Sequence, residues 1–119
     1  MSPVELWRFL PLGYLFTIAI ETPILFVGLS RHHSKRQRIA AGVWLTACSY
    51  PIVTLVLPLL FENYSRATYL LVAEIFAPVA ECGLFWLAFG KRTTWRDLII
   101  IVLANLASFI AGEISYRLI

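Results

Sequence analysis

The chain has 119 residues, of which 60% are hydrophobic and 14% are charged. A soluble domain of this length would carry roughly 25% charged residues, so the composition argues against a soluble protein and predicts one embedded in lipid. The length allows a single domain, residues 1–119, and we interpret the net charge of +3 through membrane topology rather than as a sign of nucleic-acid binding.

Four apolar runs follow one another along the chain, at residues 9–30, 39–61, 67–90 and 98–118. Each has about 20 residues or slightly more, the length that a helix needs to cross about 30 Å of hydrocarbon. The runs do not alternate polar with apolar residues, as the strands of a membrane β-barrel would. The sequence therefore predicts an all-α integral membrane protein, a four-transmembrane-helix bundle.

The first run raises the question of a cleaved leader. Residues 1–8 contain one acid and one base instead of a positive leader, and the run itself contains Glu21 and Pro23. No small-residue cleavage pattern follows it. We therefore expect the first run to be a membrane span rather than a signal peptide.

The basic residues indicate how the spans are oriented. Seven of the ten lie in the first and third connections: Arg31, Lys35, Arg36, Arg38, Lys91, Arg92 and Arg96. The positive-inside rule places these two loops in the cytoplasm and both termini outside. We expect a bacterial cytoplasmic (inner) membrane, with these seven side chains contacting lipid headgroups. His32 and His33 are interpreted as part of this solvated turn rather than as metal ligands, because no third ligand lies nearby in the sequence.

The second half of the chain repeats features of the first. The polar positions that coincide at an offset of 60 residues, or 59 after one gap in the loop, are Glu21 with Glu81, Arg31 with Lys91, Thr46 with Asn105, and Ser49 with Ser108. The offset covers two spans, so the halves would share one orientation and be related by an axis along the membrane normal. We expect two similar helical hairpins, a parallel internal repeat.

Polar side chains within the runs mark the candidate site. A carboxyl group in hydrocarbon is costly, and such residues usually face the protein interior. Counting about 1.5 Å per residue from the basic loops places one carboxyl and one neutral partner of each hairpin at the same depth. The residues expected to form this intramembrane polar site are Glu21, Glu81, Glu74, Thr46, Ser49, Asn105 and Ser108.

Two roles for this belt remain open from the sequence. The carboxyls and hydroxyls would bind a proton or a cation, or they would hold the helices together by hydrogen bonds. Pro23, Pro51 and Pro78 lie close to the belt, and proline removes a backbone hydrogen bond and can kink a helix. Glu113 lies near enough to the outer membrane surface to reach it.

The sequence leads to two expectations for function. The first is a non-catalytic subunit or accessory protein of a membrane assembly, because four spans with short loops leave no soluble active site. The alternative is a small transporter or channel that acts as a homo-oligomer and couples to protons or cations through the mid-membrane glutamates. An enzyme is not expected, since no Ser/His or Cys/His pair lies within the spans, and neither a cofactor nor a metal is expected.

Overall fold

The computed structural model describes the backbone of residues 3–118 and the side chains of residues 12–53 and 55–114. Within this part of the chain every regular element is helical, which confirms the predicted all-α class. The elements in chain order are α1 (Pro3–Gly28), α2 (Lys35–Pro51), the π-helix η1 (Ile52–Val56), α3 (Leu57–Leu60), α4 (Arg66–Phe89), the 3-10 turn η2 (Gly90–Arg92) and α5 (Trp95–Leu118).

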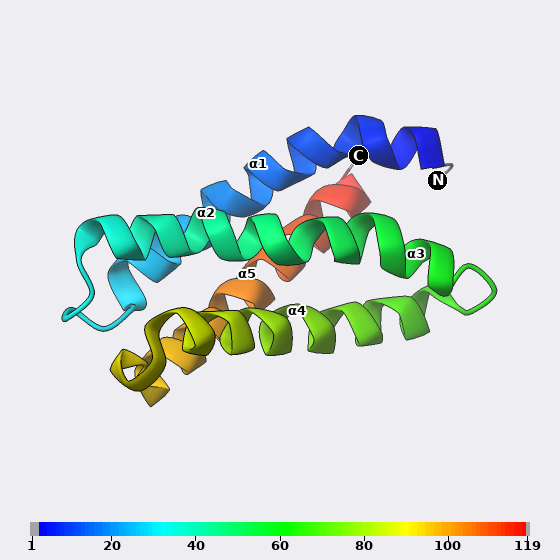
Figure 1. Cartoon of the computed structure of the whole chain (residues 1–119). Coiled ribbons are helices and arrows are strands. Elements are labelled where there is room, and N and C mark those ends of the chain that lie inside the picture. The colour runs from blue at the N-terminus through cyan, green and yellow to red at the C-terminus, as the bar shows by residue number, and fades with distance from the viewer. Residues whose placement is uncertain (1–2, 119) are drawn as a thin grey trace.

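The helices form an elongated bundle of two antiparallel hairpins, one before and one after the turn at 61–65 (Figure 1). Helix α1 packs against α2 and α5, and α4 also packs against α2 and α5. Helices α1 and α4 therefore occupy diagonal corners of the bundle. Residues 29–34 and 90–94 lie together at one end, which we call the basic end, and the turn at 61–65 lies at the opposite end.

Side-chain caps explain where the helices begin. Ser34 and Gln37 form a reciprocal capping box at the start of α2, and the Ser65 hydroxyl accepts from the backbone N–H of Thr68 at the start of α4. At the end of α4, Gly90 has a φ of 54°, a left-handed conformation that side chains disfavour. Each hairpin thus has local signals for its turns.

The three prolines expected to loosen the helices behave differently. Helices α1 and α4 continue through Pro23 and Pro78, whereas Pro51 is followed directly by the π-helix η1. In a π-helix each N–H bonds the carbonyl five residues earlier, as the N–H of Leu57 does with the carbonyl of Ile52. The Tyr69 hydroxyl on α4 donates to the carbonyl of Val53 at 2.7 Å. The irregular segment is therefore tied to the second hairpin.

The hydrophobic core lies in the half of the bundle nearer the basic end. Its buried members come from all four long helices and from Leu29 just after α1: Leu25, Leu29, Ala41, Leu45, Phe85, Ile101 and Ala104. Close contact between α1 and α2 requires Gly42, because a Cβ there would lie 2.9 Å from the Cα of Thr22. Small residues at helix contacts are typical of membrane bundles.

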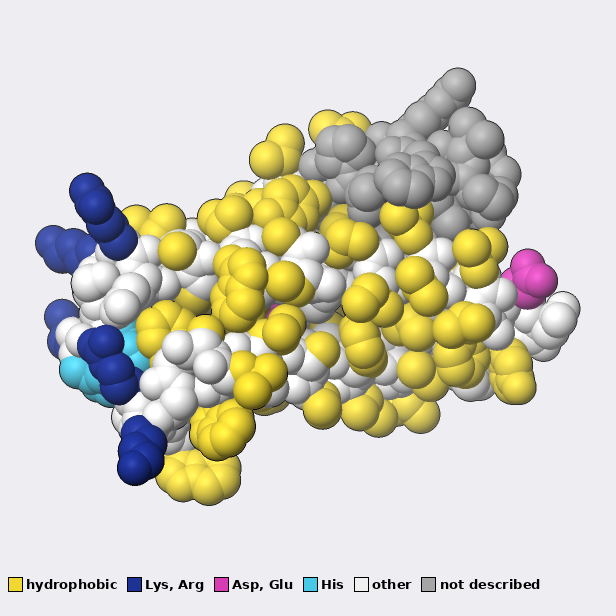
Figure 2. All heavy atoms as spheres, in the orientation of Figure 1, with side chains coloured by type: hydrophobic (Ala, Val, Ile, Leu, Met, Phe, Trp, Pro, Cys, Tyr) yellow, Lys and Arg dark blue, Asp and Glu magenta, His cyan; other side chains and the backbone are white. Residues whose placement is uncertain are grey.

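The outer surface of the bundle is largely apolar, and most of the basic side chains gather at one end (Figure 2). On α4, Leu71, Val79 and Leu87 expose 62%, 66% and 74% of their surface. Two segments among the described residues, Arg66–Arg92 and Trp95–Ile114, are long and apolar enough to cross a membrane, and Leu12–Gly28 is a shorter apolar helix. Two such segments are weak evidence of membrane association and do not establish the four predicted spans.

Candidate functional site

Two glutamates face the interior of the bundle from its diagonal helices. Glu21 on α1 is 2% exposed and Glu81 on α4 is 1% exposed. Both carboxyls therefore lie in the interior of the bundle, where the charge of Glu81 acts on Glu21, and we call them the carboxyl pair.

Each carboxyl of the pair is held by a serine from the other hairpin. The Ser108 hydroxyl on α5 donates to Glu21 Oε2 at 2.9 Å, and the Ser49 hydroxyl on α2 donates to Glu81 Oε2, also at 2.9 Å. The two serines coincide in the internal alignment, as do the two glutamates. The same hydrogen bond is therefore made twice, and each copy joins one hairpin to the other.

The other oxygen of each carboxyl forms no hydrogen bond of regular geometry with the described residues, although the Asn105 side chain lies next to the Glu81 carboxyl. Glu21 Oε1 and Glu81 Oε1 are buried, and so are the unpartnered hydroxyls of Thr22 and Thr46. A buried oxygen without a partner is costly, and it normally signals a missing proton, ion or water. Two of these four oxygens belong to carboxyl groups, and two belong to threonine hydroxyls, which can donate as well as accept.

The other two residues of the predicted site differ in their relation to the pair. Asn105 is buried on α5, donates to the carbonyl of Ile101 at 2.9 Å and lies next to the Glu81 carboxyl. Glu74 is half-buried and lies seven residues before Glu81 on α4, about 10 Å along the helix axis. Asn105 therefore joins the carboxyl pair, whereas Glu74 lies about two turns away toward the opposite end.

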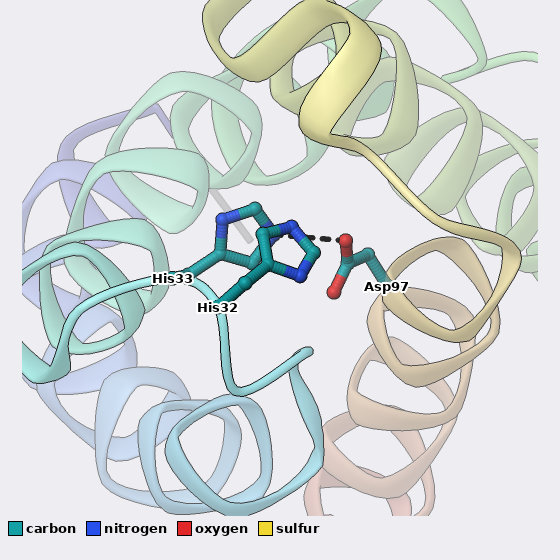
Figure 3. A group of neighbouring side chains, drawn as sticks. All are labelled: His32, His33 and Asp97. Carbon is teal, nitrogen blue, oxygen red and sulfur yellow. Dashed lines mark hydrogen bonds and ion pairs between the residues drawn. The ribbon is translucent and has the colours of Figure 1, made fainter.

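A second buried polar group lies at the basic end, between the first loop and the start of α5. His33 is 1% exposed and Asp97 is fully buried. The Nε2 atom of His33 lies 2.9 Å from Oδ2 of Asp97, and the exposed His32 ring lies beside that of His33 with centroids 4.1 Å apart (Figure 3). This arrangement corrects the sequence-based interpretation of a solvated turn for His33, which is buried against a residue 64 positions away, whereas His32 is exposed as expected.

The carboxylate of Asp97 is anchored by the backbone. It accepts from the N–H of Ser30 at 2.7 Å and from the N–H of Thr94 at 2.9 Å. Thr94 and Asp97 form a reciprocal cap at the start of α5, since the Asp97 N–H also bonds the Thr94 hydroxyl at 3.3 Å. Asp97 thus caps its own helix and ties the loop of the first hairpin to the second hairpin.

Two of the arginines expected to contact lipid headgroups, the buried Arg38 and the exposed Arg96, donate to the carbonyl end of α1. Arg38 is buried, donates to the carbonyl of Phe26 at 2.7 Å and lies over the Phe26 ring. Arg96 donates to the carbonyl of Gly28 at 2.8 Å. Cationic groups at a helix C-terminus satisfy its last carbonyls and its dipole. The other five predicted headgroup residues are exposed: Arg31, Lys35, Arg36, Lys91 and Arg92.

The opposite end carries one ion pair among the described residues. Arg66 at the start of α4 and Glu113 on α5 lie 2.7 Å apart, with 52% and 26% of their side chains exposed. Glu113 therefore has a partner near the surface. Arg8 and Arg117, the remaining two basic residues, lie outside the described side chains.

No known protein family, curated protein or solved structure matches this chain. The two buried polar groups and the apolar surface around them are the features of the molecule that bear on its function.

Sequence reasoning found the carboxyl pair but missed Asp97, His33 and Ser30. The pattern Thr94-Trp-Arg-Asp97 is a helix-start signal, which places Asp97 in the first turn of α5. That signal marks a cap but does not tell which loop would pack on it. Contact between the two loops at the basic end depends on the packing of the hairpins.

Proposed function

We propose that this protein spans a membrane with four helices, formed by two related hairpins, and that the carboxyl pair carries a proton or a monovalent cation. The observation that supports this most is the pairing of Glu21 and Glu81 in the interior, each with one oxygen held by a serine and the other unpartnered. The basic end would face the cytoplasm and both termini the other side.

The dimensions and surface of the bundle support the four-span proposal. The bundle measures 43 × 24 × 21 Å, and its long axis matches a bilayer with its headgroup regions, about 40–45 Å. Large apolar side chains are exposed on all four long helices, among them Val27, Val43, Val79 and Leu103. In water such a surface would favour aggregation, whereas the lipid of a membrane would cover it.

The chemistry of the carboxyl pair supports ion or proton binding. Two carboxylates cannot both stay charged side by side in a buried site at low cost, because desolvation and mutual repulsion both disfavour it. A shared proton, or one small cation between the unpartnered oxygens, would reduce both the desolvation cost and the repulsion between the carboxylates. The hydroxyl of Thr46 is a further neutral ligand for such a cation.

A homo-oligomer fits this proposal better than a single chain. The interior of one bundle is filled near the basic end by the core around Leu45 and Phe85. A pathway from the carboxyl pair to that side therefore needs a rearrangement or a wall from a second copy. The mass of the purified protein in detergent, measured by light scattering with the detergent subtracted, distinguishes one copy from two.

Ion flux in liposomes tests the proposed activity. Purified protein is reconstituted, and proton and Na⁺ movements are followed with pH-sensitive and Na⁺-sensitive dyes under an imposed potential. We expect wild-type flux that is lost in Glu21→Gln and in Glu81→Gln. Glu62→Gln is the matched control, since it makes the same chemical change in an exposed turn. Folded Gln variants with wild-type flux would overturn the proposal, and so would a wild type no faster than empty liposomes.

A second proposed function is that of a non-catalytic subunit of a membrane assembly. A groove of about 240 Å³ lies between α2 and α4 near the basic end, lined by Gln37, Ala40, Ala41, Trp44, Ala88 and Phe89. Its small residues leave room for a helix or a lipid chain between two aromatic walls. Extraction of the native complex in mild detergent tests this function: a stable partner lost in Ala40→Trp would support it.

A further inference from the structure

We propose that His32, His33 and Asp97 form a binding site for a divalent transition-metal ion, with Zn²⁺ as the best match. One imidazole nitrogen from each histidine and one oxygen of Asp97 all lie within 4.8 Å of one another (Figure 3). Two imidazoles and one carboxylate are a ligand set that zinc uses in proteins. This site is distinct from the carboxyl pair and does not depend on ion transport there.

Two of the three ligands are held in place before any ion arrives. The Asp97 carboxylate is oriented by the backbone N–H groups of Ser30 and Thr94. The His33 ring meets the rings of Phe85 and Phe89 edge-on, with centroids 5.5 and 4.8 Å away. A metal site needs such support, because outer contacts that orient the ligands contribute strongly to affinity.

The third ligand leaves the site open to solvent. His32 is exposed, and its Nε2 atom lies 2.6 Å from the carbonyl oxygen of Arg92. A metal ion would take that nitrogen in place of the carbonyl, by a small movement of a surface side chain. With three protein ligands the ion would keep one position for water, as zinc does in its open sites.

The charged groups around the three ligands influence which metal ion the site prefers. Arg92 and Arg96 lie close to the site, but their guanidinium groups are directed to the carbonyls of His32 and Gly28. Asp97 is the only carboxylate in the group. The site therefore favours an ion that binds imidazole nitrogen strongly over Mg²⁺ or Ca²⁺, which prefer oxygen ligands.

Metal binding would join the two hairpins at the basic end. His32 and His33 belong to the loop after α1, and Asp97 belongs to the first turn of α5. In the metal-free protein the same position is spanned by the contact between His33 and Asp97. A metal ion bound by both groups would take the place of this direct contact.

The test is metal binding by the full chain in detergent, purified with a tag that contains no histidine. Zn²⁺ is titrated by calorimetry at pH 7.5, and Co²⁺ is used as a visible probe of the coordination. We expect one ion per chain, a rise in melting temperature, and at least about tenfold weaker binding in His32→Gln. Arg31→Gln is the matched control beside it and should bind as the wild type does.

Further variants keep the test decisive. Because His33 and Asp97 are buried and their replacement could unfold the chain, His32 carries the main comparison. The result for Asp97→Asn is interpreted only if the helical content of this variant matches that of the wild type. We then expect the visible absorption of bound Co²⁺ to be lost. No binding by the wild type, or unchanged binding in His32→Gln, would overturn the proposal. His33 and Asp97 would then form only their direct contact with each other. Glu21→Gln should keep the metal, so this result is independent of flux through the carboxyl pair.

Discussion

The Ser108 hydroxyl donates a 2.9 Å hydrogen bond to Glu21, a residue 87 positions earlier in the chain. The same bond recurs between Ser49 and Glu81, which are 32 positions apart. Each bond runs from one hairpin to the other, between helices that share a face of the bundle. The two bonds are related by the internal alignment, but their surroundings differ, because the Ser108 hydroxyl also bonds the Asn105 carbonyl at 3.0 Å and the Asn105 side chain lies next to Glu81.

Loss of either serine hydroxyl should have the same effect on stability. We expect Ser49→Ala and Ser108→Ala each to lower the free energy of unfolding by about 0.6 kcal/mol and at most about 1.7 kcal/mol, as for other hydrogen bonds between membrane helices. Unfolding by a denaturing detergent in mixed micelles measures this. Ser34→Ala serves as the comparison, because its effect on stability would come from the loss of an exposed helix cap. If only one of the two interior serines mattered, the two bonds would not be energetically equivalent.

The buried contact at the basic end should matter far more than the exposed ion pair at the other end. Asp97→Ala leaves a buried histidine and two backbone N–H groups without their partner, and we expect a loss of about 3–5 kcal/mol. Glu113→Ala breaks an exposed pair with Arg66 and should cost about 0.2–1 kcal/mol. Thermal unfolding of the two variants, followed by circular dichroism, makes the comparison. Similar losses would show that Asp97 is not a structural anchor.

The orientation of the bundle can be read from the accessibility of single cysteines. Cys48 and Cys82 form no disulfide, so a background with both replaced by alanine is a reasonable starting point. Lys35→Cys at the basic end and Asn63→Cys at the opposite end are both exposed positions. In intact bacterial cells a membrane-impermeant maleimide should label position 63 and not position 35. The opposite pattern would invert the topology, and labelling of both would contradict a membrane-spanning bundle.

The helices and the carboxyl pair were predictable from sequence because both depend on local patterns. Long apolar runs define helices, and a constant rise per residue makes the depths of Glu21 and Glu81 countable. The group around Asp97 was not predictable, because its contacts join loops that only the packed hairpins bring together. The burial of Arg38 was missed for the same reason: a charge in a connection is expected at the surface unless a helix end lies within its reach.

The close contact of α1 with α2 at Gly42 offers a way to move the carboxyl pair without changing its chemistry. A methyl group at position 42 would meet the backbone of Thr22, the neighbour of Glu21, and backbone cannot move aside as a flexible side chain does. Gly83 on α4 is the matched control, because an added Cβ there has nothing within 4 Å.

We expect Gly42→Ala to separate the two helices and to destabilise the protein by about 1–3 kcal/mol. Gly83→Ala should leave stability unchanged or raise it by about 0.5–1 kcal/mol, since alanine favours a helix. If the carboxyl pair conducts, flux in liposomes should fall in Gly42→Ala and persist in Gly83→Ala. Equal stability of the two variants would show that α1 and α2 are not in contact at Gly42. A destabilised Gly42→Ala with full flux would separate the packing of this helix pair from the transport step.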